Sequence, residues 1–204
     1  MAWVRGGAAG LLVAMAGSFD TIVVWILALI AFLSFRDLGR RETTELDGSG
    51  TEDWTGWLLQ GAFLVILAAA AWDNRSSPTS SVYPLVAEAF GLALIGGALL
   101  LRRRTQEAMG RHFTVRIQSS PGHELVQTGP FRVLRHPSYA SLGLLALGTA
   151  LSTRSLHALL ATALVWVPAV AIRIAREESF LARRFGAAYQ SYAQRTWRLV
   201  PGVF

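Results

Sequence analysis

Long apolar runs separated by short polar stretches dominate the chain. A helix needs about 20 mainly apolar residues to cross roughly 30 Å of membrane hydrocarbon. Five runs reach or approach that length: Phe19–Phe35, Trp54–Ala71, Val82–Leu101, Tyr139–Leu151 and Leu156–Ile172. This pattern predicts an all-α fold, a polytopic membrane helical bundle with about five transmembrane helices.

The last two runs are separated only by the polar residues Ser152–Ser155, which predicts a helical hairpin. Its first arm is short, so it must recruit neighbouring residues or cross a locally thinned bilayer. At the other end of the chain, Arg5, a short apolar stretch and Ala14-Met15-Ala16 resemble parts of a secretory signal. Because a full span follows at once, we expect residues 1–17 to be retained, with Ala8–Ala16 either extending the first helix or lying at the interface.

Composition supports a membrane setting. Hydrophobic residues make up 52% of the 204 residues and charged residues only 16%, against about 25% charged in a typical soluble domain. Too few polar side chains remain to cover a water-facing surface, which excludes an ordinary soluble enzyme. The chain has no cysteine, which excludes disulfides and thiolate catalysis, and its four histidines lack ligand spacing, so we expect no metal site.

Charge sets the predicted orientation. All 19 cationic residues are arginine, and the net charge is +6. Two arginine-rich sections, 102–138 and 173–198, flank the predicted hairpin and so lie on one side of the membrane, which the positive-inside rule makes cytoplasmic. The N-terminus is then outside, and we expect the protein in a bacterial inner membrane. The segments between the charges are too apolar for a nucleic-acid partner, so we expect membrane lipids as partners instead.

The chain divides by content into residues 1–101, with three predicted spans, and residues 102–204, with the polar motifs, the hairpin and a C-terminal amphipathic segment. The first part holds one acid within a span, Glu88. An intramembrane acid is a functional candidate by default. It can equally serve as a structural polar link between helices, and the sequence leaves both interpretations open.

Candidate chemistry concentrates in Gly129-Pro130-Phe131-Arg132-Val133-Leu134-Arg135-His136-Pro137-Ser138-Tyr139. Proline disfavours helix for the residue before it, so we expect His136 just ahead of a helix that Pro137 opens. The free N–H groups at such a helix start can bind an anion. The alternative is a basic loop at the lipid headgroups, with Tyr139 in the aromatic belt.

A second cluster follows the hairpin, around Arg173, Arg176, Glu177 and Glu178. Residues at spacings of three or four define one stripe of an amphipathic helix with a potential break at Gly186: Glu178, Leu181, Phe185, Tyr189 and Tyr192. The alternative is an interfacial helix whose acids are solvated among arginines. Two adjacent acids are poor partners for an anionic leaflet, however, and favour a cationic ligand.

The second half of the chain combines several features in a fixed order: Glu124–Tyr139, the apolar hairpin, Arg176-Glu177-Glu178, Phe185-Gly186, Tyr189, Tyr192 and Pro201. Together they resemble the isoprenylcysteine carboxyl methyltransferase family. The resemblance covers about residues 123–204. It implies an integral membrane helical bundle that binds S-adenosylmethionine on the cytosolic side, between the Arg-His-Pro-x-Tyr loop and the C-terminal segment, while a lipophilic or lipidated substrate enters from the bilayer.

The resemblance also implies residue roles. Gly129, Pro130, His136, Pro137 and Tyr139 would form the cofactor pocket, with Glu177 or Glu178 at the charged end of the cofactor. Arg135 would lie beside the reacting carboxylate, and with Glu178 it is the predicted catalytic residue. The family has a glycine shortly after the motif tyrosine, where this chain has Ala140-Ser141 and a glycine only at Gly143; we expect a modest local shift of the pocket.

The implied function is S-adenosylmethionine-dependent methyl transfer, most simply a carboxyl O-methylation that needs no general base. A thiol or amine acceptor would require His136 or a glutamate to take a proton. Two alternatives remain open at this stage. One is an NADPH-dependent reductase of the sterol-reductase type, although the phosphates of NADPH would be repelled by two adjacent acids. The other is a non-catalytic membrane scaffold.

Overall fold

The computed structural model of the chain describes residues 26, 54–76, 85–109 and 125–204. Over these residues the regular structure is helical, apart from an isolated parallel β-bridge between Leu134 and Trp197. The predicted span Phe19–Phe35 lies outside the described residues except for Ile26, which is helical and exposed. An all-helical fold is therefore confirmed, whereas the predicted number of five spans stays a prediction.

The second and third predicted spans are helices. Helix α2 covers Trp54–Ser76, five residues more than predicted. Helix α3 covers Leu85–Met109, so the arginines that follow the apolar run belong to the same helix. Two helical segments of the described chain are long and apolar enough to cross a membrane, Trp54–Ser76 and Leu156–Phe185.

The predicted hairpin is also present. Its first arm is α4, Pro137–Ser152, and its second arm runs without a break through α5 (Leu156–Ala161), a π-helical turn η4 (Thr162–Trp166) and α6 (Val167–Phe185). The second arm is thus much longer than the apolar run that predicted it. Helix α7, Ala187–Ala193, follows after Gly186, whose φ of 51° ends α6 at the predicted position.

The π-helical turn has a local cause in Pro168. Proline has no N–H to donate, and its ring excludes the carbonyl four residues earlier. Immediately before it, the Val167 N–H bonds to the Thr162 carbonyl, one residue further back than in an α-helix. The wider turn lets the helix continue past the proline and places Trp166 inward, where its ring fills the space left by Gly143 of α4.

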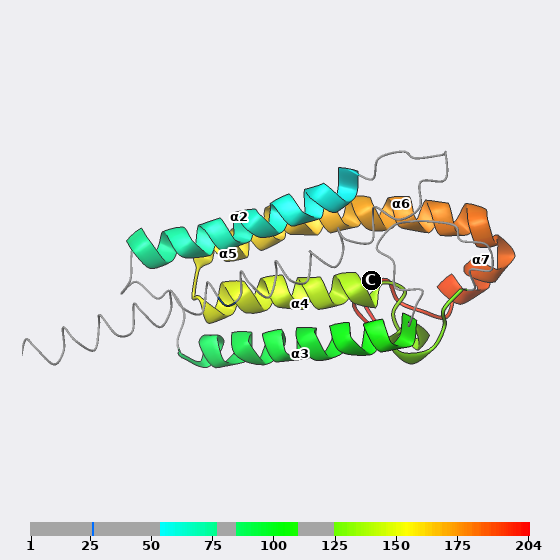
Figure 1. Cartoon of the computed structure of the whole chain (residues 1–204), viewed down its shortest axis with the longest axis horizontal. Helices are drawn as coiled ribbons and strands as arrows, with labels where there is room; N and C mark the ends of the chain where they lie inside the picture. Colours follow the sequence, from blue (N-terminus) through cyan, green and yellow to red (C-terminus); the bar gives the residue numbers. More distant parts are fainter. Residues whose placement is uncertain (1–25, 27–53, 77–84, 110–124) are drawn as a thin grey trace, which may run out of the picture.

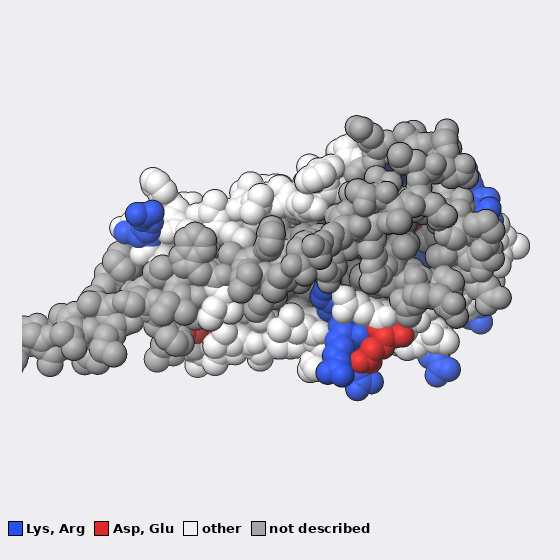
Figure 2. Space-filling model, viewed as in Figure 1, with Lys and Arg blue, Asp and Glu red and all other residues white. Residues whose placement is uncertain are grey.

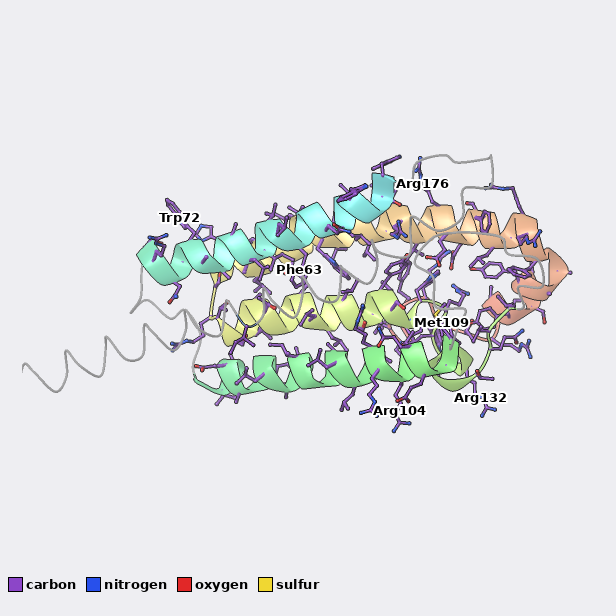
Figure 3. The ribbon with its side chains drawn as sticks, in the orientation of Figure 1. Phe63, Trp72, Arg104, Met109, Arg132 and Arg176 are labelled. Carbon is purple, nitrogen blue, oxygen red and sulfur yellow. The ribbon has the colours of Figure 1, made fainter. Side chains whose placement is uncertain are left out.

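The helices form two packed pairs that run side by side (Figure 1). Helix α2 packs along α5 and α6, and α3 packs along α4. Between the pairs lies a core built from a few large side chains, among them Phe63, which points inward in Figure 3, and from many alanines. Small residues let helices approach closely, which is how helices associate in lipid, where burial of apolar surface gives little gain.

The surface is consistent with a bilayer around the helices. Charged side chains gather toward the ends of the visible helices and leave the surface between them uncharged (Figure 2). Helix α2 exposes Trp54 and Trp57 at its start and Trp72 near its end. Trp54 and Trp72 are about 27 Å apart along a helix, close to the thickness of membrane hydrocarbon. Tryptophans at both ends of such a stretch are typical of an integral membrane protein.

At the Trp72 end, polar contacts tie the hairpin turn to both neighbouring helices. Asp73 of α2 accepts hydrogen bonds from the Ser155 hydroxyl (2.7 Å) and the His157 backbone N–H (3.2 Å), and lies 2.6 Å from His157 Nδ1. Glu88 of α3 pairs with Arg154, Oε2 to Nε 3.7 Å. Of the two interpretations of Glu88, these contacts favour the structural link between helices.

Candidate active site

The motif loop has the conformation that its sequence predicts. Gly129 begins a 3-10 turn, Gly129–Arg132, with φ of 58°, and a Cβ at this position would lie 3.0 Å from Ala108 Cβ of α3. The Pro130 carbonyl closes the turn by accepting the N–H groups of Val133 and Leu134. His136 is the N-cap of α4 and Pro137 its first residue, as predicted.

The tail of the chain holds this loop in place. The backbone N–H of Arg135 bonds to the Trp197 carbonyl (2.7 Å) and that of His136 to the Arg198 carbonyl (3.1 Å). In return the Trp197 N–H bonds to the Val133 carbonyl (2.9 Å). The guanidinium of Arg135 donates from Nη1 to the carbonyl of Ala193 at the end of α7. Two segments about 60 residues apart in sequence therefore form one structural unit.

Glu178 lies at the centre of this unit. Its carboxylate accepts hydrogen bonds from Arg198 Nε at 3.0 and 3.2 Å and lies 2.9 Å from Arg198 Nη2. It also lies 3.0 Å from Arg135 Nε and 3.5 Å from His136 Nε2. Only 16% of its side chain is exposed. Glu178 is thus the shared anion of two arginines and a histidine that come from the loop and the tail.

Buried polar atoms without hydrogen-bond partners gather around the two acids. They are Glu177 Oε2, His136 Nε2 and the Tyr189 hydroxyl. Glu177 Oε2 lies 3.6 Å from His136 Nδ1, too far for a good hydrogen bond. Buried polar groups are nearly always paired, so a cluster of unpaired donors and an acceptor indicates a place where a polar ligand binds.

The hydroxyl of Tyr189 remains a donor at neutral pH. Burial, followed by the negative charge of Glu178, raises the pKa of Tyr189. Tyr192, one turn later on α7, has a different setting, because its hydroxyl donates to the Phe131 carbonyl at 2.9 Å. Burial raises the pKa of Tyr192 to about 12. One tyrosine of α7 therefore supports the loop, and the other offers a free hydroxyl group.

Tyr139 is held in place by α6 and α2. Its hydroxyl accepts a hydrogen bond from Arg173 Nε (2.6 Å), and Arg173 Nη1 donates to Thr55 Oγ1 of α2 (2.7 Å). Arg173 and Thr55 are almost fully buried. The ring of Tyr139 stacks on that of His136 with centroids 5.7 Å apart. A chain of contacts thus runs from α2 through α6 and α4 to the unpaired nitrogen of His136.

The structure therefore brings most of the predicted site residues together. His136 and Tyr139 stack on each other, and His136, Arg135, Glu177 and Glu178 share one cluster. The alternative of a Tyr139 in the aromatic belt is wrong, since Tyr139 is only 8% exposed. The alternative of an interfacial helix with solvated acids is wrong as well, since the side chains of Glu177 and Glu178 are only 26% and 16% exposed.

The sequence alone does not single out every residue of the cluster. It indicates no role for Thr55, Arg173 or Arg198, and it places Tyr189 on the helix stripe without a further role. Spacing gave a signal for Arg173, which lies four residues before Glu177, but none for Thr55 or Arg198, whose contacts depend on how distant helices pack.

Ser141, in place of the family's glycine, is buried and donates to the Ser138 carbonyl (2.7 Å) within its own helix.

Much of the chain is similar to known methyltransferases. A family model described as phospholipid methyltransferase matches residues 86–188, about half of the chain. The chain is 35% identical over 116 residues to protein-S-isoprenylcysteine O-methyltransferase B of Arabidopsis thaliana, covering 56% of this chain and 59% of that protein. It is 32% identical over 115 residues to a probable protein-S-isoprenylcysteine O-methyltransferase of Oryza sativa subsp. indica, covering 55% and 60%. The match thus spans about three fifths of these curated relatives.

A solved structure has a similar fold. It is the eukaryotic intramembrane Ras methyltransferase, an isoprenylcysteine carboxyl methyltransferase, with a TM-score of 0.60 at 20% identity, covering 94% of this chain and 73% of that one. The family match begins at residue 86, inside α3 and earlier than the motifs that carry the resemblance. The chain therefore belongs to the phospholipid methyltransferase family, and its predicted resemblance to the isoprenylcysteine carboxyl methyltransferases is confirmed.

Proposed function

We propose that this protein transfers a methyl group from S-adenosylmethionine to the carboxylate of a lipophilic, prenylcysteine-like acceptor at the membrane. The observation that carries the proposal is the cluster of unpaired buried groups around Glu177 and Glu178, beside the Arg-His-Pro-x-Tyr loop. The similarity to O-methyltransferases of prenylated cysteine gives the acceptor class.

The residues present fit the cofactor. S-adenosylmethionine carries a sulfonium, an ammonium and a carboxylate group, and it supplies an activated methyl group when bound. Glu177 Oε2 is a buried, unpaired acceptor suited to a cation, and His136 Nε2 and the Tyr189 hydroxyl suit a carboxylate or hydroxyl groups. Paired acids disfavour the phosphates of NADPH, which argues against the reductase alternative.

The remaining chemistry belongs to the side chains of this chain. A carboxylate acceptor is ionised at neutral pH, so no residue has to remove a proton. We assign to Arg135 the role of orienting that carboxylate, while Glu178 and the Ala193 carbonyl fix the guanidinium. Tyr139, held by Arg173, sets the position of the His136 ring. Alignment of reactants in a water-poor site can by itself supply several kcal/mol of catalysis.

Orientation follows from the arginines. The end of the bundle that carries α7 and Arg102–Arg104 would face the cytoplasm of a bacterial inner membrane, with the N-terminus outside. Figure 3 shows Arg104 and Arg132 at this end, both pointing away from the helices. The positive-inside rule supports this orientation.

Two measurements on purified protein in lipid nanodiscs test the proposal. Calorimetric titration with S-adenosylhomocysteine should saturate, whereas titration with NADPH should not. Saturation by NADPH alone would indicate a reductase. Saturation by neither compound would indicate a non-catalytic scaffold. Radiolabelled methyl donor should then label a prenylcysteine analogue. Label found only in a phospholipid extract would contradict the proposed acceptor. The matched control is Arg103→Gln, which lies on α3 in an exposed pair with Glu107 and should behave as wild type.

A further inference from the structure

The chain segment after α7 presents apolar side chains to the surroundings although it belongs to no spanning helix. Its exposed apolar residues, with their exposed fractions, are Trp197 (46%), Val200 (51%), Val203 (78%) and Phe204 (45%). Val133 (49%) of the motif loop adjoins them, because its carbonyl accepts the Trp197 N–H. We call them the tail patch. Exposed apolar side chains gathered in one segment can mark a surface that contacts a partner or a membrane.

The tail patch has a defined conformation. The N–H groups of Leu199 and Val200 bond to the Phe204 carbonyl at 2.8 and 2.9 Å, and the Phe204 N–H returns a bond to the Val200 carbonyl at 3.0 Å. The guanidinium of Arg198 lies over the Phe204 ring, 4.9 Å from its centroid. The backbone of Trp197 is tied to Val133 and Arg135 of the motif loop. The apolar side chains are therefore held on a rigid support.

Its position along the bundle indicates what covers it. Figure 1 places the C-terminal end level with the start of α4 and close to the level of the start of α2. The start of α2 carries exposed Trp54 and Trp57, and exposed tryptophans mark the membrane–water interface. The C-terminal end of the tail patch thus lies close to the level that the exposed tryptophans at the start of α2 mark.

Its charges fit the same surroundings. Arg198 is already balanced by Glu178, so the charges available to the surroundings are those of Arg132 and Arg195. Arg132 of the motif loop is exposed beside Val133, and Arg195 is exposed two residues before Trp197. Tryptophan, valine and phenylalanine flanked by arginines are typical of segments that lie in the headgroup layer, where apolar groups enter the acyl boundary and cations contact phosphates.

We propose that the tail patch binds the surface of an anionic phospholipid leaflet on the side of the candidate site. The proposal does not depend on methyl transfer, because depth and composition alone carry it. It gives the tail, whose backbone holds Arg135 and His136, a second attachment besides its contacts with the protein.

The absence of cysteine from the chain makes a direct test simple. Val203→Cys, carrying a nitroxide spin label, is reconstituted in vesicles of phosphatidylglycerol and phosphatidylcholine. Accessibility to oxygen, which concentrates in the bilayer, is compared with accessibility to a water-soluble nickel chelate. The control is Ser191→Cys on α7, also exposed but in a polar setting.

The ratio of oxygen to nickel accessibility should be severalfold higher at position 203 than at 191. Equal ratios at the two positions would overturn the proposal. So would a dipolar coupling between labels at 203 of two molecules together with protection from both reagents, since that would assign the patch to a second copy of the chain. Circular dichroism of both variants checks that they remain folded.

Discussion

Glu177 and Glu178 are adjacent in the chain but have different surroundings. Glu178 is shared by Arg135, Arg198 and His136, whereas one oxygen of Glu177 is buried without a partner. The two acids should therefore differ in what they contribute: Glu178 holds the loop and the tail together, and Glu177 is available to a ligand.

Exchange of each acid for its amide tests this division. Glu177→Gln should weaken binding of S-adenosylhomocysteine by at least tenfold, or about 1.4 kcal/mol, and leave the unfolding temperature nearly unchanged. Glu178→Gln should lower the unfolding temperature, because Arg198 and Arg135 lose the charge that balances them. Calorimetry and thermal unfolding measure the two effects, and the opposite assignment of the effects would refute the division.

The two tyrosines of α7 provide a second comparison of single atoms. Tyr189→Phe removes a hydroxyl that has no hydrogen-bond partner, so the free energy of unfolding should not fall, while binding of S-adenosylhomocysteine should weaken. Tyr192→Phe removes the bond to the Phe131 carbonyl and should cost about 1 kcal/mol. Denaturant titration in detergent measures both. A larger loss of stability in Tyr189→Phe would show that its hydroxyl is paired in the folded protein.

At the scale of elements, α3 and α4 approach each other through their glycines. A Cβ on Gly91 would clash with the Ser152 nitrogen and lie 2.8 Å from the Gly148 oxygen, and a Cβ on Gly148 would lie 2.8 Å from the Gly91 oxygen. Backbone stands in the way on both sides, so no side chain can move aside. This contact fixes the spacing of the helices that support the motif loop.

Addition of one methyl group tests this contact. Gly91→Ala should destabilise the protein by about 1–3 kcal/mol, because the helices must separate. Gly96→Ala on the same helix meets nothing within 4 Å and should be neutral or stabilising by up to about 1 kcal/mol, the gain in helix propensity. The midpoint of thermal unfolding, followed by circular dichroism, compares them. Similar midpoints would show that α3 and α4 do not touch at Gly91.

At the scale of the whole molecule, the two ends of the bundle differ in character. One end carries the candidate site, the tail and most of the arginines of the described chain; the other carries Trp72, Asp73 and the hairpin turn. The proposed orientation assigns the first end to the cytoplasm, where S-adenosylmethionine is made.

Single cysteines introduced into the cysteine-free chain test this orientation. Ser191→Cys on α7 should react with a membrane-impermeant maleimide only in inverted membrane vesicles, and Arg75→Cys, exposed at the opposite end of α2, only in intact spheroplasts. The control is complete labelling of both in detergent. Reaction of both positions from one side would contradict the proposed span of α2 or of the hairpin.

Much of the fold could be predicted because each feature depends on neighbours in sequence. Apolar runs gave the helices, Pro137 gave the start of α4, and Gly186 gave the end of α6. The motif loop and the acids likewise carried the family resemblance. Within a helix, spacing determines which side chains share a face, so the position of Arg173 and Glu177 on one face of α6 could also be predicted.

Only the tertiary structure decided which of these groups meet and which stay unpaired. Thr55 contacts Arg173, and Arg198 pairs with Glu178, although the partners lie far apart in the chain. The same packing leaves one oxygen of Glu177 without a partner. No local pattern encodes such contacts, because they depend on the distance and rotation between helices. By itself the sequence determined the helices, the membrane setting and the family motif; helix packing decided which acid remains open to a ligand.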